Sequence, residues 1–191
     1  MSPLISTANL VLSLATIVGQ VIVAVLILNL IIYRGRGYLS EIIGRYGLLC
    51  SFIVAAAATF GSLFYSEIAG FEPCKLCWFQ RILMYPQIIL LGMAYSKKDK
   101  NIANYGIVLS GIGALIAGYH YLLQLGLVPS IACSAVGYSI ACSQRFVMNF
   151  GYITIPMMSF TAFLMILFFL ITQKITDKAY SKYDDNVIHN A

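Results

Sequence analysis

Five apolar stretches, each long enough to cross a membrane, constrain the fold of this chain more than any other feature. A helix needs about 20 apolar residues to span the hydrocarbon core of a bilayer. The stretches are Asn9–Tyr33, Tyr46–Ser66, Trp78–Ser96, Ala103–Leu125 and Tyr152–Gln173. The segments between them are too short for a soluble domain. We therefore predict an all-α membrane protein, because a helix satisfies its own backbone hydrogen bonds in lipid.

The basic residues are distributed unevenly among the connections. A net charge of +5 would suit nucleic acid, but cytoplasmic loops of membrane proteins also carry an excess of Lys and Arg. Most of the basic residues lie in the first and third connections and the C-terminal segment: Arg34, Arg36, Arg45, Lys97, Lys98, Lys100, Lys174, Lys178 and Lys182. This pattern predicts an N-terminus outside the cell, a cytoplasmic C-terminus and no nucleic-acid partner. We expect the first stretch to be a retained helix, because no basic residue precedes it and no small-residue cleavage site follows.

A cysteine pair with two intervening residues stands between the second and third stretches. Cys74 and Cys77 follow Pro73, which suits the first position of a helix, so we expect the pair to begin the third helix. The helix dipole and free N–H groups there stabilise a thiolate, the attacking species in disulfide exchange. Arg81 lies one helical turn further on, and a charge within a span costs about 2.5–3.5 kcal/mol. Arg81 is a candidate to bind a thiolate or a quinone oxygen; the alternative is a side chain that only extends to the interface.

A second cysteine pair, Cys133 and Cys142, lies in the next connection on the same predicted side of the membrane. It can close into a disulfide in an oxidising compartment. That disulfide is either a structural bridge or the exchange partner of the first pair. His120, near the outer end of the fourth stretch, is either a donor to a quinone carbonyl or a packing residue. Cys50 lies within the second stretch, and we expect it to be a buried hydrophobic residue without a redox role.

Two dithiols on one side of a membrane, with an arginine beside one of them, suit electron transfer from thiols to a lipid-soluble oxidant. We therefore interpret the chain as a membrane thiol oxidase and expect no metal site. Three alternatives remain. A vitamin K epoxide reductase-like enzyme has loop cysteines that precede its CxxC, whereas here they follow it. Four outer cysteines could instead form a tetrathiolate zinc site, and a transporter or assembly scaffold would leave both pairs and Arg81 without a role.

One part of the sequence resembles a known family. The segment Pro73–Arg81, which reads PCKLCWFQR, closely resembles the loop-to-helix signature of the DsbB/BdbC disulfide-bond-formation proteins. Tyr119–Tyr121, the loop between Cys133 and Cys142, and the segment Gly151–Pro156 fit the same family, nearest its BdbC-like branch. The resemblance extends from about Tyr46 to Gln173.

The family implies a four-helix transmembrane bundle, here residues 46–173. Residues 1–45 would then be one extra N-terminal transmembrane helix with its cytoplasmic connection. Residues 174–191 would form a cytoplasmic tail, which we expect to be partly disordered. The resemblance also implies the bacterial cytoplasmic membrane as the location, with the active cysteines on the extracytoplasmic side.

The resemblance further implies an activity. Family members reoxidise an extracytoplasmic thioredoxin-fold thiol oxidase (DsbA/BdbD-like) and pass the electrons to a membrane quinone, either ubiquinone or menaquinone. By position, Cys133 would form the mixed disulfide with the partner, and Cys142 would then attack Cys74. Cys77 would face the quinone, and Arg81 matches the family's quinone-contacting arginine. Gln80 and His120 are further candidates for the quinone site.

Overall fold

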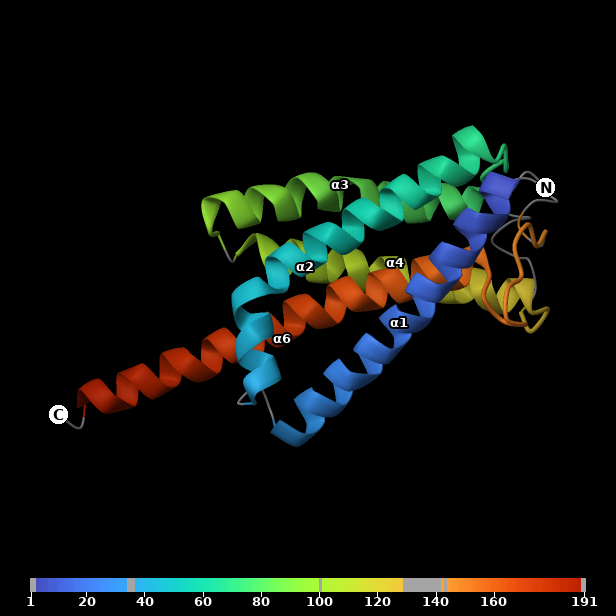
Figure 1. The fold of residues 1–191 in the computed structure, drawn as a ribbon. Helices are drawn as coiled ribbons and strands as arrows, with labels where there is room; N and C mark the ends of the chain where they lie inside the picture. The colour runs from blue at the N-terminus through green and yellow to red at the C-terminus, as the bar shows by residue number, and fades with distance from the viewer. Residues whose placement is uncertain (1–2, 34–36, 100, 129–141, 143, 190–191) are drawn as a thin grey trace.

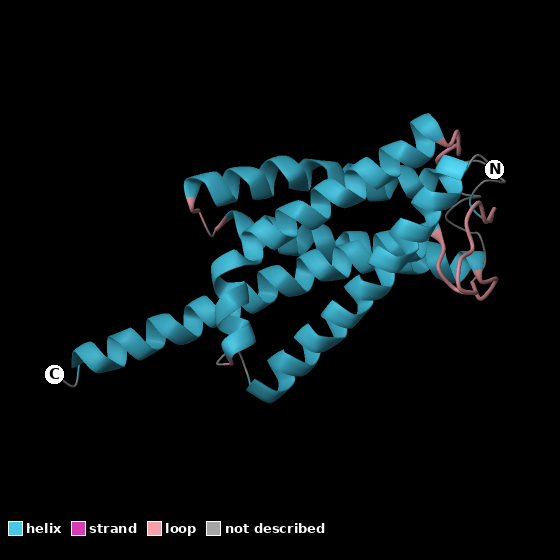
Figure 2. Ribbon diagram, in the orientation of Figure 1, coloured by secondary structure: helices cyan, strands magenta, loops and turns pink. Residues whose placement is uncertain are grey.

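The chain folds into long helices joined by short connections (Figure 1). The computed structural model describes residues 3–33, 37–99, 101–128, 142 and 144–189, without the side chains of 182–189. The helices are α1 (Pro3–Tyr33), α2 (Tyr38–Leu63), the short π-helix η1 (Phe64–Ile68), α3 (Lys75–Lys97), α4 (Ile102–Gln124) and α6 (Ile155–His189). Five segments, with η1 continuing α2, are long and apolar enough to cross a membrane. Figure 2 shows the described chain as helices and loops, and the predicted all-α membrane fold is confirmed.

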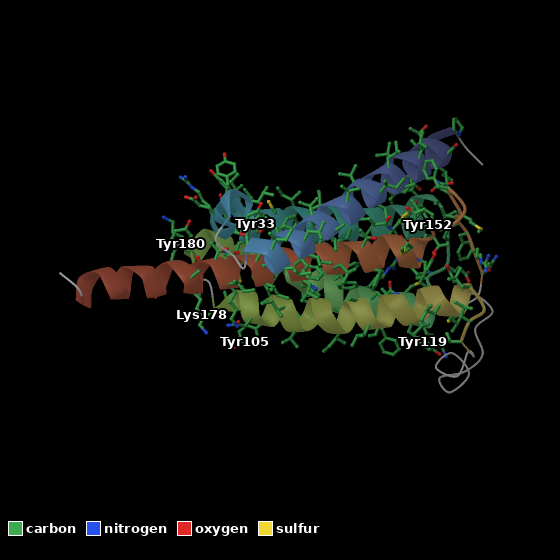
Figure 3. The ribbon with its side chains drawn as sticks, turned by 90° about the horizontal axis from the view of Figure 1, so that it is seen from below. Tyr33, Tyr105, Tyr119, Tyr152, Lys178 and Tyr180 are labelled. Carbon is green, nitrogen blue, oxygen red and sulfur yellow. The ribbon has the colours of Figure 1, made fainter. Side chains whose placement is uncertain are left out.

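The connections gather at two opposite ends of the molecule. The N-terminus, the η1–α3 loop and the segment before α6 lie at one end, which we call the outer end (Figure 1). The α1–α2 and α3–α4 connections and the C-terminal part of α6 lie at the other, inner end. Tyrosines mark both ends, with Tyr119 and Tyr152 at the outer end and Tyr33 and Tyr105 at the inner end (Figure 3), as is common where helices meet a membrane interface. The first and third connections and the C-terminal part of α6, which carry most of the basic residues, thus lie at the same, inner end.

The core of the bundle lies between α2, α3, α4 and α6, and small residues allow these helices to approach closely. Phe163 of α6 is fully buried and packs directly against Gly113 of α4. A Cβ atom at Gly113 would lie 2.3 Å from the Phe163 ring. Gly106 likewise leaves room for Leu170. Because lipid provides little hydrophobic driving force, such close packing is a main source of helix association in membranes.

Helix α1 packs mainly against α6, and polar contacts fix it at both ends. At the outer end, Asn149 Nδ2 donates to Ser13 Oγ at 2.8 Å. At the inner end, Ser40 Oγ of α2 donates to Asn29 Oδ1 at 2.5 Å. Asn29 and Ser40 are both buried, so the apolar surroundings favour keeping this bond. Helix α1 is thus attached in a defined register.

Two helices extend beyond the apolar stretches that the sequence predicts. The basic connection before residue 46 is already part of α2, which begins at Tyr38, because Ser40 and Ile43 are buried against α1 and α6. Residues 174–189 continue α6, where we expected a partly disordered tail. This segment contains no glycine or proline to end the helix, and Thr176 Oγ1 donates to the Ser40 carbonyl at 3.2 Å.

Candidate functional site at the outer end of the bundle

The first cysteine pair begins helix α3, as the sequence predicts. Cys74 is the N-cap residue, with extended backbone angles, and its sulfur accepts a hydrogen bond from the Cys77 amide at 3.4 Å. Pro73 precedes the N-cap, so our placement of this proline at the first helical position was wrong. The cap matters because an extended N-cap residue points its side chain back at the free N–H groups of the first turn. The local fold therefore places the Cys74 sulfur at the positive end of the helix dipole.

The two sulfurs of this pair are in direct contact and share one hydrogen bond. Cys74 Sγ and Cys77 Sγ lie 3.0 Å apart, and Cys74 is only 4% exposed. The hydrogen bond with the Cys77 thiol is the main influence that lowers the pKa of Cys74, to about 4. Burial acts in the opposite direction, while His120 and the Cys77 amide lower the pKa further. Cys74 is therefore the sulfur that carries the negative charge when the pair is reduced.

His120 of α4 lies against the Cys74 sulfur. Its Nε2 atom is 3.6 Å from Cys74 Sγ and 3.3 Å from the Cys142 carbonyl oxygen. On its other side, Gln80 Nε2 is 3.0 Å from His120 Nδ1. An amide nitrogen only donates, so Nδ1 is the acceptor and the ring proton resides on Nε2. Gln80 thus holds the imidazole with its N–H directed at the cysteine.

The second pair is represented by Cys142, because Cys133 lies outside the described residues. Cys142 is disulfide-bonded and 2% exposed. It belongs to the same buried cluster as Cys74, together with Leu76 and Leu123. The structure therefore brings one member of the second pair to the side of Cys74 on which His120 lies. The role of Cys133 stays a prediction.

Arg81 is held beside this site by a residue of α2. Its Nε atom donates to Ser62 Oγ and its Nη2 atom to the Ser62 carbonyl, each at 3.0 Å. The guanidinium carbon also lies 5.4 Å from the centre of the Trp78 ring, within the range of a cation–π contact. Two hydrogen bonds to one residue fix the plane of the guanidinium group. The guanidinium group of Arg81 is therefore held against α2.

A cavity of about 270 Å³ opens next to Cys77 and Arg81. Its walls come from α1, α2, η1, α3 and α6, and most of the lining is apolar. The polar side chains of Gln80, Arg81 and Ser62 are part of the lining. A smaller cavity of about 60 Å³ lies around Cys74, Cys77 and His120. Cys77 and Arg81 line both cavities, so they lie between the space around Cys74 and His120 and the larger, mostly apolar cavity.

The placement of the predicted residues divides into two groups. Cys77, Gln80 and Arg81 line the large cavity, whereas His120 lines only the small one. A quinone contact of His120 stays a prediction; its observed contacts are with Cys74, Gln80 and Cys142. Cys50 is apart from the site and packs against a cluster of Leu26, Ile43 and Phe169.

Sequence reasoning missed two contributions to the site. Ser62 fixes Arg81, but one serine among many small residues of α2 gives no signal of this role. Helix α1 contributes Leu12, Ala15 and Thr16 to the cavity wall. Polar residues within an apolar stretch, such as Asn9 and Ser13, indicate that α1 packs against protein. They do not identify the helix that α1 contacts.

The ligand atoms of Cys74, Cys77 and His120 lie within 4.8 Å of one another, which is close enough to hold a metal ion. A tetrathiolate zinc site would need all four outer cysteines as free thiolates. Cys142 is instead disulfide-bonded. The geometry therefore offers at most three ligands from the described residues at this position.

A reactive dithiol at a helix N-terminus, beside a second cysteine pair and inside a multi-pass helical bundle, defines a membrane protein of thiol–disulfide chemistry. The chain belongs to the family of disulfide bond formation protein DsbB, whose family model matches residues 44–173. Helix α1 and the start of α2 lie outside this match.

Curated relatives agree with the family assignment. The chain is 44% identical over 122 residues to a probable disulfide formation protein C of Bacillus cereus, covering 64% of this chain and 87% of the relative. It is 45% identical over 119 residues to a probable disulfide formation protein of Oceanobacillus iheyensis, covering 62% and 82%. It is 40% identical over 128 residues to disulfide bond formation protein C of Bacillus subtilis, covering 64% and 88%. No solved structure matches the chain significantly. The resemblance to the BdbC-like branch is consistent with these relatives.

Proposed function

We propose that this chain reoxidises an extracytoplasmic thioredoxin-fold thiol oxidase and passes the electrons through its two cysteine pairs to a membrane quinone. One observation carries the proposal: Cys74 lies beside His120 and the buried, disulfide-bonded Cys142, whereas Cys77 lines a mostly apolar cavity together with Arg81. Thiols from water reach the first side, and a hydrophobic oxidant dissolved in the membrane reaches the second. Family membership supports disulfide formation as the outcome.

The exchange half begins at the second pair. A partner thiolate attacks Cys133 and releases Cys142 as a thiolate, which attacks Cys74 and releases Cys77. The second partner thiol then attacks its mixed disulfide with Cys133, which frees oxidised partner and the Cys133 thiol. Cys133 finally attacks Cys142 and releases Cys74. Two electrons and two protons have then moved from the partner to the CxxC pair, and the second pair is a disulfide again.

The observed surroundings of Cys74 suit this last step. The leaving thiolate departs faster when its pKa is low, and the pKa of Cys74 is lowered to about 4. The His120 Nε2–H is directed at the departing sulfur. It can donate a hydrogen bond to the anion while Gln80 keeps the ring oriented. We therefore assign His120 to the exchange half of the reaction.

The oxidation half takes place next to the large cavity. A quinone accepts two electrons and two protons from the Cys74–Cys77 dithiol, which closes to a disulfide. Cys77 faces the cavity, and Arg81 supplies N–H donors and a positive charge where negative charge develops on oxygen or sulfur. The guanidinium is already fixed by Ser62, so little reorganisation is needed at the moment of transfer.

The orientation in the membrane follows from the same proposal. The outer end carries the reactive cysteines and faces the extracytoplasmic side, and the inner end carries the basic segments and faces the cytoplasm. The N-terminus is then outside and the C-terminus inside.

A thiol count on purified protein tests the proposed function. The chain has five cysteines, and we expect one free thiol, from Cys50, as isolated in the oxidised state. Reduction should expose all five, and anaerobic addition of quinone should return the count to one. Four additional thiols that are free from the start, do not respond to quinone and accompany bound zinc would overturn the proposal. Reoxidation of only one pair would leave the other pair structural and contradict the relay.

A further inference from the structure

Helix α1 provides one wall of the large cavity, although it lies outside the family match. Leu12, Ala15 and Thr16 line the cavity, and their spacing of three and four residues places them on one face of the helix. Gly19, one turn further along this face, packs against α6. A Cβ atom at Gly19 would lie 2.7 Å from the sulfur of Met165, which also lines the cavity.

Leu12 lies close to the polar region of the cavity. Its methyl carbons would be 3.6 and 3.8 Å from a Cβ atom at Gly61 of α2. Gly61 is adjacent to Ser62, which holds Arg81. Helix α1 therefore covers the site laterally, on the side of α2 and α6.

Ala15 of α1 and Ala57 of α2 mark the place where the cavity opens. Both line the cavity and yet are exposed, whereas Thr16 beside Ala15 is buried. Because α1 packs mainly against α6, the surface at Ala15 faces the surrounding membrane. A ligand with its polar head near Arg81 and a long hydrocarbon part can extend past Ala15 into lipid.

The wall is rigid because polar contacts hold α1 on both sides of this region. Asn149 bonds Ser13 at 2.8 Å, and Tyr152 OH donates to Gln20 Oε1 at 2.9 Å. Ser13 and Gln20 lie on either side of Ala15 and Thr16 in the sequence, and Leu12 directly precedes Ser13. The three wall residues therefore keep a fixed position relative to α6 and the outer-end loop.

We infer that α1 is the part of the quinone site that binds the hydrocarbon tail, and that the tail leaves the cavity past Ala15. This inference rests on the proposed function. It assigns to the additional helix a role in substrate affinity and selectivity: α1 favours quinones with a long apolar tail over the same ring without one.

The test compares two substitutions of the same type on α1. Ala15→Phe adds a ring at the opening. Ala24→Phe adds the same ring at an exposed position of α1 that does not line the cavity. For each protein we would measure KM for a decyl-tailed quinone and for the same quinone ring without the tail. We expect Ala15→Phe to raise KM for the tailed quinone about tenfold, which corresponds to the loss of a few buried methylene contacts. KM for the tail-less ring should change less than about twofold, and Ala24→Phe should change neither.

Binding without turnover gives a second measurement. Trp78 is the only tryptophan and contacts Arg81, so a bound quinone should quench its fluorescence. In a Cys77→Ser background, Ala15→Phe should weaken binding of the tailed quinone by the same factor. Leu12→Ala, which removes wall contacts instead of filling the opening, should also weaken the tailed quinone selectively.

The outcomes separate the inference from the proposed function. Suppose that the wild-type protein reduces both quinones, and that neither Ala15→Phe nor Leu12→Ala changes the ratio of their KM values. Then α1 is not the tail site, while quinone reduction stands. Equal weakening of both quinones would also overturn the inference, because the wall would then contact the ring. If the wild-type protein neither binds nor reduces either quinone, both the inference and the proposed function fail.

Discussion

The two sulfurs of the CxxC pair have different surroundings although they are in contact. Cys74 is buried beside the His120 ring, which also contacts the Cys142 carbonyl. Cys77 also lines the large and mostly apolar cavity, with Arg81 four residues further along α3. One side provides hydrogen-bond donors to a sulfur anion, and the other provides space for a hydrophobic ligand. In the proposed function, a single turn of helix separates thiol exchange from quinone reduction.

The difference follows from which helices cover each sulfur. Helix α4 supplies His120 to the Cys74 side, and α1, α2 and α6 supply the walls on the Cys77 side. Gln80 of α3 contacts both, because it lines the large cavity and bonds to His120. The four predictions below test whether the two sides can be disturbed separately.

The largest expected effect is the loss of quinone reduction in Cys77→Ser. Serine keeps the size of the side chain but cannot form the disulfide that quinone reduction produces. Quinone reduction with any thiol donor should fall to background, while the tailed quinone should still quench Trp78 fluorescence. Cys50→Ser is the control and should be indistinguishable from wild type. Residual turnover in Cys77→Ser would contradict the assignment of Cys77 to the quinone side.

Arg81→Ala should weaken quinone binding without disturbing exchange at Cys74. The loss of a charge-assisted hydrogen bond costs about 1.5–3 kcal/mol, which is roughly a tenfold to hundredfold rise in KM for quinone. The rate at which a dithiol reduces the Cys74–Cys77 disulfide, measured by stopped flow without quinone, should change little. Unchanged quinone kinetics in Arg81→Ala would remove its assigned role.

The sequence predicts the part of the site that lies on helix α3 better than the surroundings that other helices supply. The position of Cys74 and Cys77 at the start of a helix is local information, since a few neighbouring residues determine where α3 begins. Arg81 follows at helical spacing on the same helix. These elements could therefore be located before any tertiary structure was known.

The cavity, in contrast, depends on contacts between segments far apart in the sequence. Ser62 and Arg81 are brought together by packing of α2 on α3, and nothing in the spacing of either segment identifies that pair. The same holds for Leu12 and Ala15, which gain a role only because α1 docks on α6. His120 was recognised as a candidate, but its contact with Cys74 depends on how α3 and α4 pack. The helical continuation of α6 beyond residue 174 was missed because a mixed-charge segment suits both a tail and a solvated helix.

His120→Phe should shift the pH dependence of Cys74 alkylation. Its effect should be smaller than the effects of Cys77→Ser and Arg81→Ala. The pKa of Cys74 in the folded protein is lowered to about 4, so its thiolate persists above that value and is lost as the pH falls through it. His120 is one cause of the lowering, so its removal should raise the pKa of Cys74. Cys74 of the reduced protein would be alkylated at a series of pH values from 3 to 8, and the product would be quantified by mass spectrometry. As the pH is lowered, alkylation should decline at a higher pH in His120→Phe than in wild type.

A matched variant separates the hydrogen bond from packing. His120→Gln keeps an N–H donor near the sulfur and should lie between His120→Phe and wild type in the alkylation profile. Quinone binding measured by Trp78 fluorescence should be similar in all three proteins. A profile that is identical in His120→Phe and wild type would contradict the role of His120 at Cys74.

Ser62→Ala should give the smallest effect and the finest test of the comparison. It removes the hydroxyl that accepts from Arg81 Nε but keeps the backbone carbonyl that accepts from Nη2. A typical hydrogen bond contributes about 1 kcal/mol, so KM for quinone should rise roughly fivefold. Combining Ser62→Ala with Arg81→Ala should add nothing further, because the serine acts through the arginine. Additive effects in the double variant would mean that Ser62 contacts the quinone itself, and the positioning role would be wrong. The alkylation profile of Cys74 should stay that of wild type in Ser62→Ala, since the groups that lower the pKa of Cys74 are Cys77 and His120 and not Ser62 or Arg81.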